Sequence, residues 1–303
     1  MNAPADEAPD TGDHSGVRPR YRTDPWLRTG PWVLGRRDAA TGLHTARHAR
    51  TGELARAWLL RPNASADAAA AFAAREAALQ AQGHRALPTL QGSGRIPDGT
   101  RWMLLEAFPG VSLARRLRRG PLVAEEAVAL GRSLASALEA LHGAGFVHGS
   151  LCPEHVLLAP DASQGLRIQL TGFGHIARLD AGGDHVARTP PLPAPAAAGG
   201  LASGFVPPER VVQRPMGRAS DLWSAGAVLF YALTGRAPFT GGSIAHLTAQ
   251  LVREPAPSVA LYRADAPLHL VRAIAQLLRT CPEHRFRGAE DLGRALAEAA
   301  SGR

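Results

Sequence analysis

Three histidines and a cysteine lie within one short part of the chain and could together bind a metal ion. They are His148, Cys152, His155 and His175. Imidazole and thiolate groups are ligands that zinc and copper favour. The spacings match no recognised ligand motif, however, and buried structural roles explain the same residues. We therefore expect no metal site here.

Ser150, two residues beyond His148, is a candidate nucleophile for a hydrolase. Such a serine needs a base and an acid that orients the base, often with a G-x-S-x-G turn around the nucleophile. Neither the turn nor an orienting acid accompanies Ser150. The residues here do not favour hydrolase chemistry.

Arginine supplies all of the positive charge. The 34 basic residues are all arginine, the formal net charge is +8, and the sequence has no lysine. Chemistry that needs a lysine amine, such as a Schiff base or a phosphate-loop lysine, is excluded. Basic charge alone is weak support for nucleic acid binding, so nucleic acid is not an expected partner. Only two cysteines occur, which excludes a disulfide framework.

Four arginines cluster within five residues, at Arg115, Arg116, Arg118 and Arg119. Such a cluster could bind a phosphorylated or acidic protein partner. A solvated helix face explains the same pattern, and both interpretations stay open.

The elements that must position these residues fall into two groups. Short apolar patches with turn residues between them predict antiparallel strands within residues 31–62, and an alanine-rich helix is expected over 65–82. A buried strand is expected over 102–108, before the break at Pro109 and Gly110. The rest is mainly helical, with helices expected over residues 113–119, 124–142, 220–233, 243–252, 268–278 and 289–299.

Other segments set the expected boundaries. Residues 1–29 are expected to be a disordered tail, and residues 190–204 a Pro/Ala/Gly-rich loop. No apolar run is long enough to span a membrane, and the N-terminus lacks the apolar centre of a signal peptide. These features predict a cytoplasmic protein.

Several motifs, in order along the chain, carry a resemblance to a known family. FVHGSLCPEHVLL over residues 146–158 resembles the catalytic loop of a protein kinase, and LTGFG over 170–174 resembles its magnesium-binding D-F-G segment. PPER over 207–210 resembles the A-P-E end of the activation segment. SDLWSAG over 220–226 and CPEHR over 281–285 are similar to two motifs of the helical lobe.

The resemblance implies an α+β, bilobal protein-kinase-like fold. A small β-sheet lobe with one helix is expected over residues 30–107, and a larger helical lobe over 108–303. It also implies structural roles for His148 and Phe173 in the buried spine, Asp221 at the catalytic-loop backbone, and the pair formed by Glu209 and Arg285.

Four positions depart from the family pattern in residues that carry chemistry. Trp58 stands where the pattern has the phosphate-binding lysine, Ser150 where it has the proton-accepting Asp, His155 where it has the metal-binding Asn, and Gly172 where it has the Asp of D-F-G. Phosphoryl transfer relies on positioning and on neutralised charge, so we expect ordinary magnesium-dependent transfer to be lost.

Weaker candidates for contact with a nucleotide are Gly35 in a glycine-rich loop, Glu106 and Ala107 near the end of the buried strand, and Glu76 on the helix. Arg75 is the alternative to Glu76 in the helix register. Arg36 or Arg56 could supply the missing lysine charge.

The sequence thus predicts a pseudokinase, not an enzyme, that acts as a scaffold or allosteric regulator in serine/threonine kinase signalling. Its expected partner is a protein, either an active kinase or a phosphorylated or acidic protein. No cofactor is expected. The alternative is an atypical ATP-binding enzyme with weak protein kinase or other transferase activity, and ATP bound without magnesium belongs to that alternative.

Overall fold

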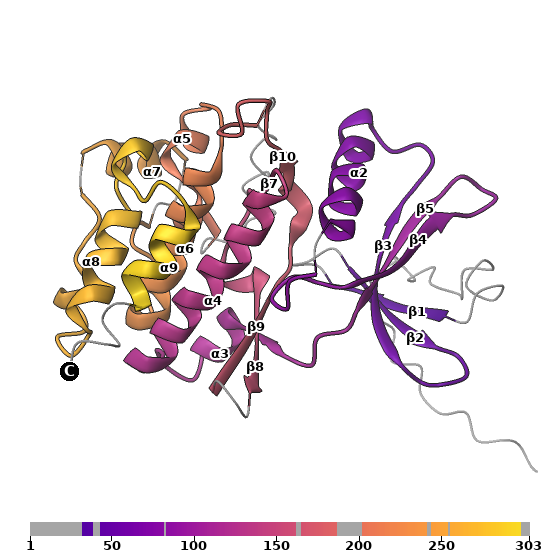
Figure 1. Cartoon of the computed structure of the whole chain (residues 1–303), viewed down its shortest axis with the longest axis horizontal. Coiled ribbons are helices and arrows are strands. Elements are labelled where there is room, and N and C mark those ends of the chain that lie inside the picture. The colour runs from indigo at the N-terminus through magenta and orange to yellow at the C-terminus, as the bar shows by residue number, and fades with distance from the viewer. Residues whose placement is uncertain are drawn as a thin grey trace, which may run out of the picture.

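A computed structural model describes residues 32–38, 43–81, 83–161, 165–186, 202–240, 244–253 and 255–297. The expected N-terminal tail over residues 1–29 and most of the expected loop over 190–204 lie outside these residues. The described chain forms two lobes side by side, a sheet with one helix and a larger helical body (Figure 1). This is the α+β, bilobal kinase-like fold that the motifs predict.

A five-stranded antiparallel sheet forms the smaller lobe. Its spatial order is β1-β2-β3-β5-β4. The strands are β1 (Trp32–Arg37), β2 (His44–His48), β3 (Leu54–Leu60), β4 (Leu90–Arg95) and β5 (Arg101–Glu106). Trp58 lies opposite Met103 in the register of β3 and β5. Gly52, at φ +74°, makes the turn between β2 and β3, where a left-handed backbone favours glycine.

One helix, α2 (Ala66–Gln80), packs on this sheet (Figure 1). Ser65 begins it, since the serine side chain accepts a hydrogen bond from the Ala68 amide. Phe72 and Leu79 are buried on one side of the helix. The position of α2 therefore depends on apolar packing against the sheet.

The larger lobe contains short strands and turns as well as helices. The strands are β6 (Val111–Ser112), β7 (Phe146–Val147), β8 (Val156–Asp161), β9 (Gly165–Leu170) and β10 (Ala177–Arg178). The helices are α3 (Leu113–Leu117), α4 (Ala124–Gly143), α5 (Pro208–Val211), α6 (Arg218–Thr234), α7 (Ile244–Arg253), α8 (Leu268–Leu277) and α9 (Ala289–Ala297). The 3₁₀ turns of the described residues lie between them: η1 (Pro153–His155), η2 (Phe173–His175), η3 (Ala202–Phe205), η4 (Val259–Leu261) and η5 (Pro282–His284).

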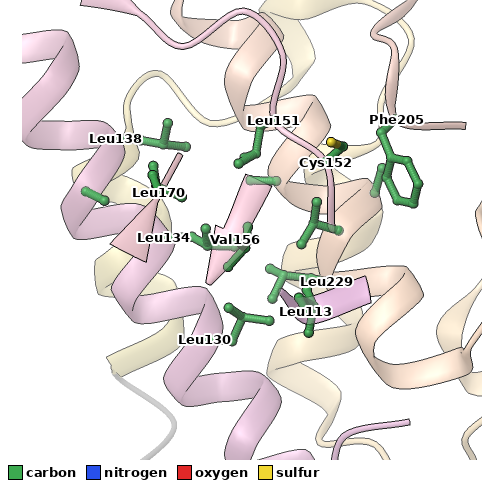
Figure 2. Close-up of a cluster of buried hydrophobic side chains, with 14 of the residues drawn as sticks. Leu113, Leu130, Leu134, Leu138, Leu151, Cys152, Val156, Leu170, Phe205 and Leu229 are labelled. Atoms are coloured by element: carbon green, nitrogen blue, oxygen red, sulfur yellow. The ribbon is translucent and has the colours of Figure 1, made fainter. Parts of the chain in front are cut away.

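The core of the larger lobe lies between α4, α6 and the β8–β9 hairpin. Figure 2 shows Leu130, Leu134 and Leu138 of α4 pointing toward Val156 and Leu170. Helix α6 is buried along nearly its whole length. A Cβ atom on Gly226 would come within 2.6 Å of the Leu277 Cβ atom, so glycine permits α6 and α8 to approach closely. This core fixes the β8–β9 hairpin, and the segment after β9 contains residues of the candidate site.

No helix among the described residues is long and apolar enough to cross a bilayer.

Candidate functional site

A cleft of about 370 Å³ lies between the two lobes. Arg56 and Trp58 of β3 line it on the sheet side, and Gln169 and Thr171 line it on the other side. Glu106 and the chain after β5 close its back. Its volume is in the range of small-molecule sites, so the two lobes together form a candidate binding site.

Trp58 and Arg75 occupy the inner end of the sheet side. The Trp58 side chain is 6% exposed and lines the cleft. The Arg75 guanidinium lies 5.0 Å from the centre of the Trp58 ring, and its Nε donates to the Phe173 carbonyl oxygen at 2.5 Å. Desolvation lowers the pKa of Arg75 to about 10, so the group stays charged near neutral pH. Arg75 therefore connects α2, β3 and the larger lobe.

Glu76 departs from its expected place at the nucleotide site. Its Oε2 atom accepts a hydrogen bond from Arg101 Nη2 at 2.6 Å, and Glu76 is not among the residues that line the cleft. Successive helix residues point about 100° apart, so only one of Arg75 and Glu76 can face inward. The alternative register, with Arg75 inward, is the one that the fold adopts.

Asp221 of α6 organises the backbone of the catalytic-loop segment. It accepts hydrogen bonds from the backbone amides of His148 at 2.7 Å and Gly149 at 2.8 Å, and from His142 Nε2 at 2.9 Å. Burial alone would raise the pKa of Asp221, but the hydrogen bond and charge of His142, with further polar contacts, hold it below its usual value. A fully ionised Asp221 thus fixes this loop in the position that the resemblance implies.

His148 packs against Phe173, which lines the cleft. Their ring centres are 5.0 Å apart, and His148 Nε2 lies 2.8 Å from the Thr171 carbonyl oxygen. Burial lowers the pKa of His148 to about 4. His148 is thus a neutral, fully buried imidazole that packs on Phe173, which is compatible with the spine role that the resemblance implies.

Ser150, His155 and Gly172 lie together beyond the cleft floor. Ser150 Oγ donates to the Gly172 carbonyl oxygen at 2.8 Å, and His155 Nδ1 lies 2.7 Å from the Ser150 carbonyl oxygen. Gly172 has φ +72°, and a Cβ atom built on it would collide with the imidazole ring of His155, 2.1 Å from its Cγ atom. The His155 ring therefore fills the space that a side chain at position 172 would need.

The magnesium ion that the resemblance implies does not fit this arrangement. Magnesium prefers hard oxygen ligands such as carboxylates. Position 172 offers no side chain, and an imidazole stands in its place. In the part of the chain that the structure describes, no three His, Cys, Asp or Glu side chains come together as a metal site. Burial and the nearby Glu154 carboxylate also raise the pKa of the Cys152 thiol, which disfavours the thiolate.

Of the remaining candidates for nucleotide contact, one lines the cleft and two do not. Glu106 lines the cleft, whereas Ala107 and Gly35 are not among its lining residues. A Cβ atom on Gly35 would collide with the Thr45 hydroxyl, so this glycine allows β1 and β2 to pack closely. That is a structural reason for the glycine, different from the phosphate contact that the sequence suggests.

The four clustered arginines do not form one surface. Arg115 and Arg118 line the cleft. Arg116 points elsewhere, since its guanidinium bonds to Glu126 Oε2 at 3.2 Å and to the Gly120 carbonyl oxygen at 3.1 Å. Arg119 is exposed. Successive helix residues point about 100° apart, so Arg115 and Arg118, three residues apart, share a face that Arg116 does not.

Glu209 and Arg285 form a buried ion pair, as the resemblance implies. Arg285 Nη1 and Nη2 donate to the two Glu209 carboxylate oxygens, both at 2.9 Å. Ser220 Oγ also donates to Glu209 at 2.6 Å. This network joins α5 and α6 to the turn η5.

Arg210 is a site residue that the sequence analysis missed. Its side chain is buried, and Nη1 donates to the Gly149 carbonyl oxygen at 2.6 Å while Nη2 donates to His175 Nδ1 at 3.3 Å. Burial and the Arg210 charge lower the pKa of His175 to about 4. No local pattern marks Arg210, because its partners lie 35 and 61 residues away in the sequence.

This fold and cleft define a two-lobed domain of the kinase type, and comparison with known proteins agrees. The protein kinase domain family matches residues 65–289. The chain therefore belongs to the protein kinase family.

Curated relatives support that assignment. Serine/threonine-protein kinase PknK of Mycobacterium tuberculosis is 33% identical over 220 residues, which cover 71% of this chain and 18% of the relative. Serine/threonine-protein kinase PkaA of Streptomyces coelicolor is 36% identical over 203 residues, which cover 66% of this chain and 34% of the relative. Serine/threonine-protein kinase PknA of M. tuberculosis is 27% identical over 218 residues, which cover 71% of this chain and 45% of the relative. The chain thus spans less than half the length of these relatives.

The expectation that the chain is not an enzyme is wrong on this comparison, because these relatives carry the names of kinase enzymes. That expectation equates activity with four particular side chains, at positions 58, 150, 155 and 172. Phosphoryl transfer depends on positioning and charge neutralisation, which other groups can supply. The individual roles that the resemblance gives to these residues stay predictions.

Proposed function

We propose that this chain is an atypical nucleotide-using member of the protein kinase family, with weak protein kinase or other phosphoryl transferase activity. The names of its relatives support serine or threonine side chains as acceptors. In such a transfer, an oxygen–phosphorus bond forms at the acceptor hydroxyl. The terminal phosphate's bond to the leaving diphosphate breaks, and the acceptor proton passes to a base.

The observation that carries this proposal is the set of guanidinium groups on the cleft. Arg56 enters from β3, and Arg115 and Arg118 enter from α3 and its end. Guanidinium groups remain charged at all relevant pH values and can bind phosphate oxygens through two parallel hydrogen bonds. They replace, by different geometry, the positive charge that the family pattern supplies with lysine.

Nucleotide binding to single variants tests the proposal. Arg56→Gln and Arg118→Gln should each weaken ATP binding by about tenfold or more, because a charged hydrogen bond contributes about 1.5–3 kcal/mol. Arg119→Gln is the matched control and should bind as the parent does, since Arg119 is exposed and does not line the cleft. Equal affinity in all three variants would contradict a role for the cleft arginines.

Transfer itself is measured by radiolabel from ATP on a protein substrate. If Arg56→Gln lowers the incorporated label by the same factor as it lowers ATP affinity, this chain transfers the phosphate. If no cleft variant changes the amount of label, the label comes from a contaminating kinase.

A second candidate is a scaffold or regulatory role toward another kinase in serine/threonine signalling, in the cytoplasm. What favours it are two sets of buried contacts, those of Asp221 with the backbone of His148 and those of Glu209 with Arg285, which hold the catalytic-loop and PPER segments in place for a partner to recognise. Adding this chain to a purified partner kinase should change the partner's rate. The change should persist in Arg56→Gln, which separates regulation from this chain's own catalysis.

A further inference from the structure

His155 and Gly172 form a pair next to the cleft, since their chain neighbours Glu154, Thr171 and Phe173 line it. By the resemblance, position 172 corresponds to the family's metal-binding carboxylate and position 155 to a second metal ligand. In this chain the two substitutions match each other sterically, because the imidazole of His155 occupies the volume of a side chain at position 172. An acidic side chain cannot be accommodated there while the histidine is present.

The hydrogen bonds around the pair keep the imidazole in place. His155 Nδ1 lies 2.7 Å from the Ser150 carbonyl oxygen, so Nδ1 is the donor nitrogen of this contact. Ser150 Oγ donates in turn to the Gly172 carbonyl oxygen at 2.8 Å. The Thr171 amide also donates to the His155 carbonyl oxygen at 2.8 Å. These bonds join the two segments that hold the pair and fix the ring over Gly172.

The acids that do line the cleft come from separate elements. Asp38 follows β1, Glu106 ends β5 and Glu154 lies in η1. Glu154 contacts the buried Cys152 thiol. No group of three metal-binding side chains forms among the described residues. The lining acids therefore do not rebuild the ligand set that position 172 lacks.

Cationic side chains line the same cleft, and one more lies next to it. Arg56, Arg115 and Arg118 line it, and the charged Arg75 guanidinium lies behind Trp58. Guanidinium groups attract a more negative anion more strongly, since the Coulomb energy grows with charge. A nucleoside triphosphate carries more negative charge when it is free than when it is complexed to magnesium.

We propose that this cleft binds a nucleoside triphosphate as the free anion, without a divalent cation, because His155 occupies the place of the metal-binding carboxylate and arginines neutralise the phosphates. The inference rests on the proposed nucleotide binding and adds that the binding does not need metal.

ATP titrated in magnesium and in EDTA at equal ionic strength tests this inference on the full chain by calorimetry. Binding in EDTA that is at least as tight as in magnesium supports it, and we expect it to be about two- to tenfold tighter. Tighter binding in magnesium overturns the inference and leaves the proposed function standing. Binding in neither buffer overturns both.

Rebuilding the metal site gives a second, independent readout. The double variant His155→Asn/Gly172→Asp removes the imidazole and restores a carboxylate, so magnesium should now tighten ATP binding by about tenfold. A folded double variant that binds ATP as the parent does in both buffers would contradict the role given to His155.

Thermal unfolding checks that the two positions are coupled. Gly172→Asp alone should lower the midpoint because the new side chain collides with His155, and His155→Asn should restore part of the loss. Gly145→Asp is the matched control, because Gly145 also has a positive φ (+83°) but a Cβ atom there meets nothing within 4 Å. Equal losses in Gly172→Asp and Gly145→Asp would show only the cost of the backbone conformation and would contradict the collision.

Discussion

At the scale of single residues, several side chains in the catalytic-loop region are buried in one protonation state. His148 has no exposed surface, and burial lowers its pKa to about 4. The pKa of His175 is lowered to about 4 as well, by desolvation and by the charges of Arg210 and Arg75. Buried neutral imidazoles make stability depend on pH, because in mild acid they are protonated in the unfolded state and stay neutral in the native state.

His148 predicts a loss of stability in mild acid. Its native pKa lies below the ordinary value of 6.5, so the unfolded state binds more protons as pH falls below about 6.5 and is favoured. The stabilisation is complete above that value and is lost toward a pH of about 4. Between about pH 7 and about pH 5, His148 should lower the free energy of unfolding by about 2 kcal/mol.

Urea unfolding at both pH values measures this loss. In His148→Gln the drop between the two pH values should be smaller by the same amount, whatever the variant's absolute stability. An equal drop in parent and variant would show that His148 is not held neutral.

At the scale of elements, one guanidinium joins the C-terminal part of the larger lobe to α5 and α6. Arg285 uses all five of its N–H donors. Their acceptors are the two Glu209 carboxylate oxygens and the carbonyl oxygens of Ala219, Arg279 and Thr280, at 2.8–2.9 Å. The planar fork of arginine suits this set, whereas a lysine ammonium has three donors at a single point.

Arg285→Lys should therefore destabilise the fold although the charge is kept. We expect a loss of about 2 kcal/mol or more, because buried carbonyl oxygens lose their donors. Denaturant unfolding gives the value. Arg294→Lys on α9 is the control, since the Arg294 side chain is exposed in its pairs with Glu290 and Asp291, and the change should alter stability by less than about 0.5 kcal/mol. Similar losses in the two variants would contradict the special role of Arg285.

At the scale of the whole molecule, Arg75 is one link between the lobes. It belongs to α2 of the smaller lobe and bonds to the Phe173 carbonyl oxygen of the larger lobe. Helix α2 also packs against η2 and β10 (Figure 1). The placement of α2 thus depends on contacts from both lobes, and the stacking of Arg75 on Trp58 couples it to the cleft.

Arg75→Gln should loosen α2 without unfolding the protein. Losing a hydrogen bond from a charged donor and the contact with Trp58 should speed amide exchange in α2 by about tenfold or more. Hydrogen exchange read by mass spectrometry measures this. Arg95→Gln, at an exposed position on β4, should leave the rates unchanged. Unchanged α2 exchange in Arg75→Gln would show that other contacts hold the helix.

Much of the fold could be predicted from the sequence, because its motifs are local. The S-D-x-W helix, the PPER segment and the CPEHR turn each identify a position in a known architecture. In the structure Asp221 accepts from the backbone amide of His148, and Glu209 pairs with Arg285. The helix expected over residues 65–82 is α2 (Ala66–Gln80). The lobe boundary between residues 107 and 108 stays a prediction.

The site was less predictable because its contacts join residues far apart in the sequence. Arg75 meets a carbonyl group 98 residues away, and Arg210 meets one 61 residues away. A local sequence pattern cannot predict such distant partners. The inward choice of Arg75 over Glu76 depends on the rotation of α2, which side-chain packing sets and the motif does not.

The sequence by itself determined the family, the order of elements and the exclusion of a lysine at the cleft, since composition and local motifs are properties of the chain alone. Only the tertiary structure decided that His155 fills the space beside Gly172, that two of four clustered arginines face the cleft, and that Arg75 bridges the lobes. Those facts depend on volume and distance between packed segments, and these exist only once the chain has folded.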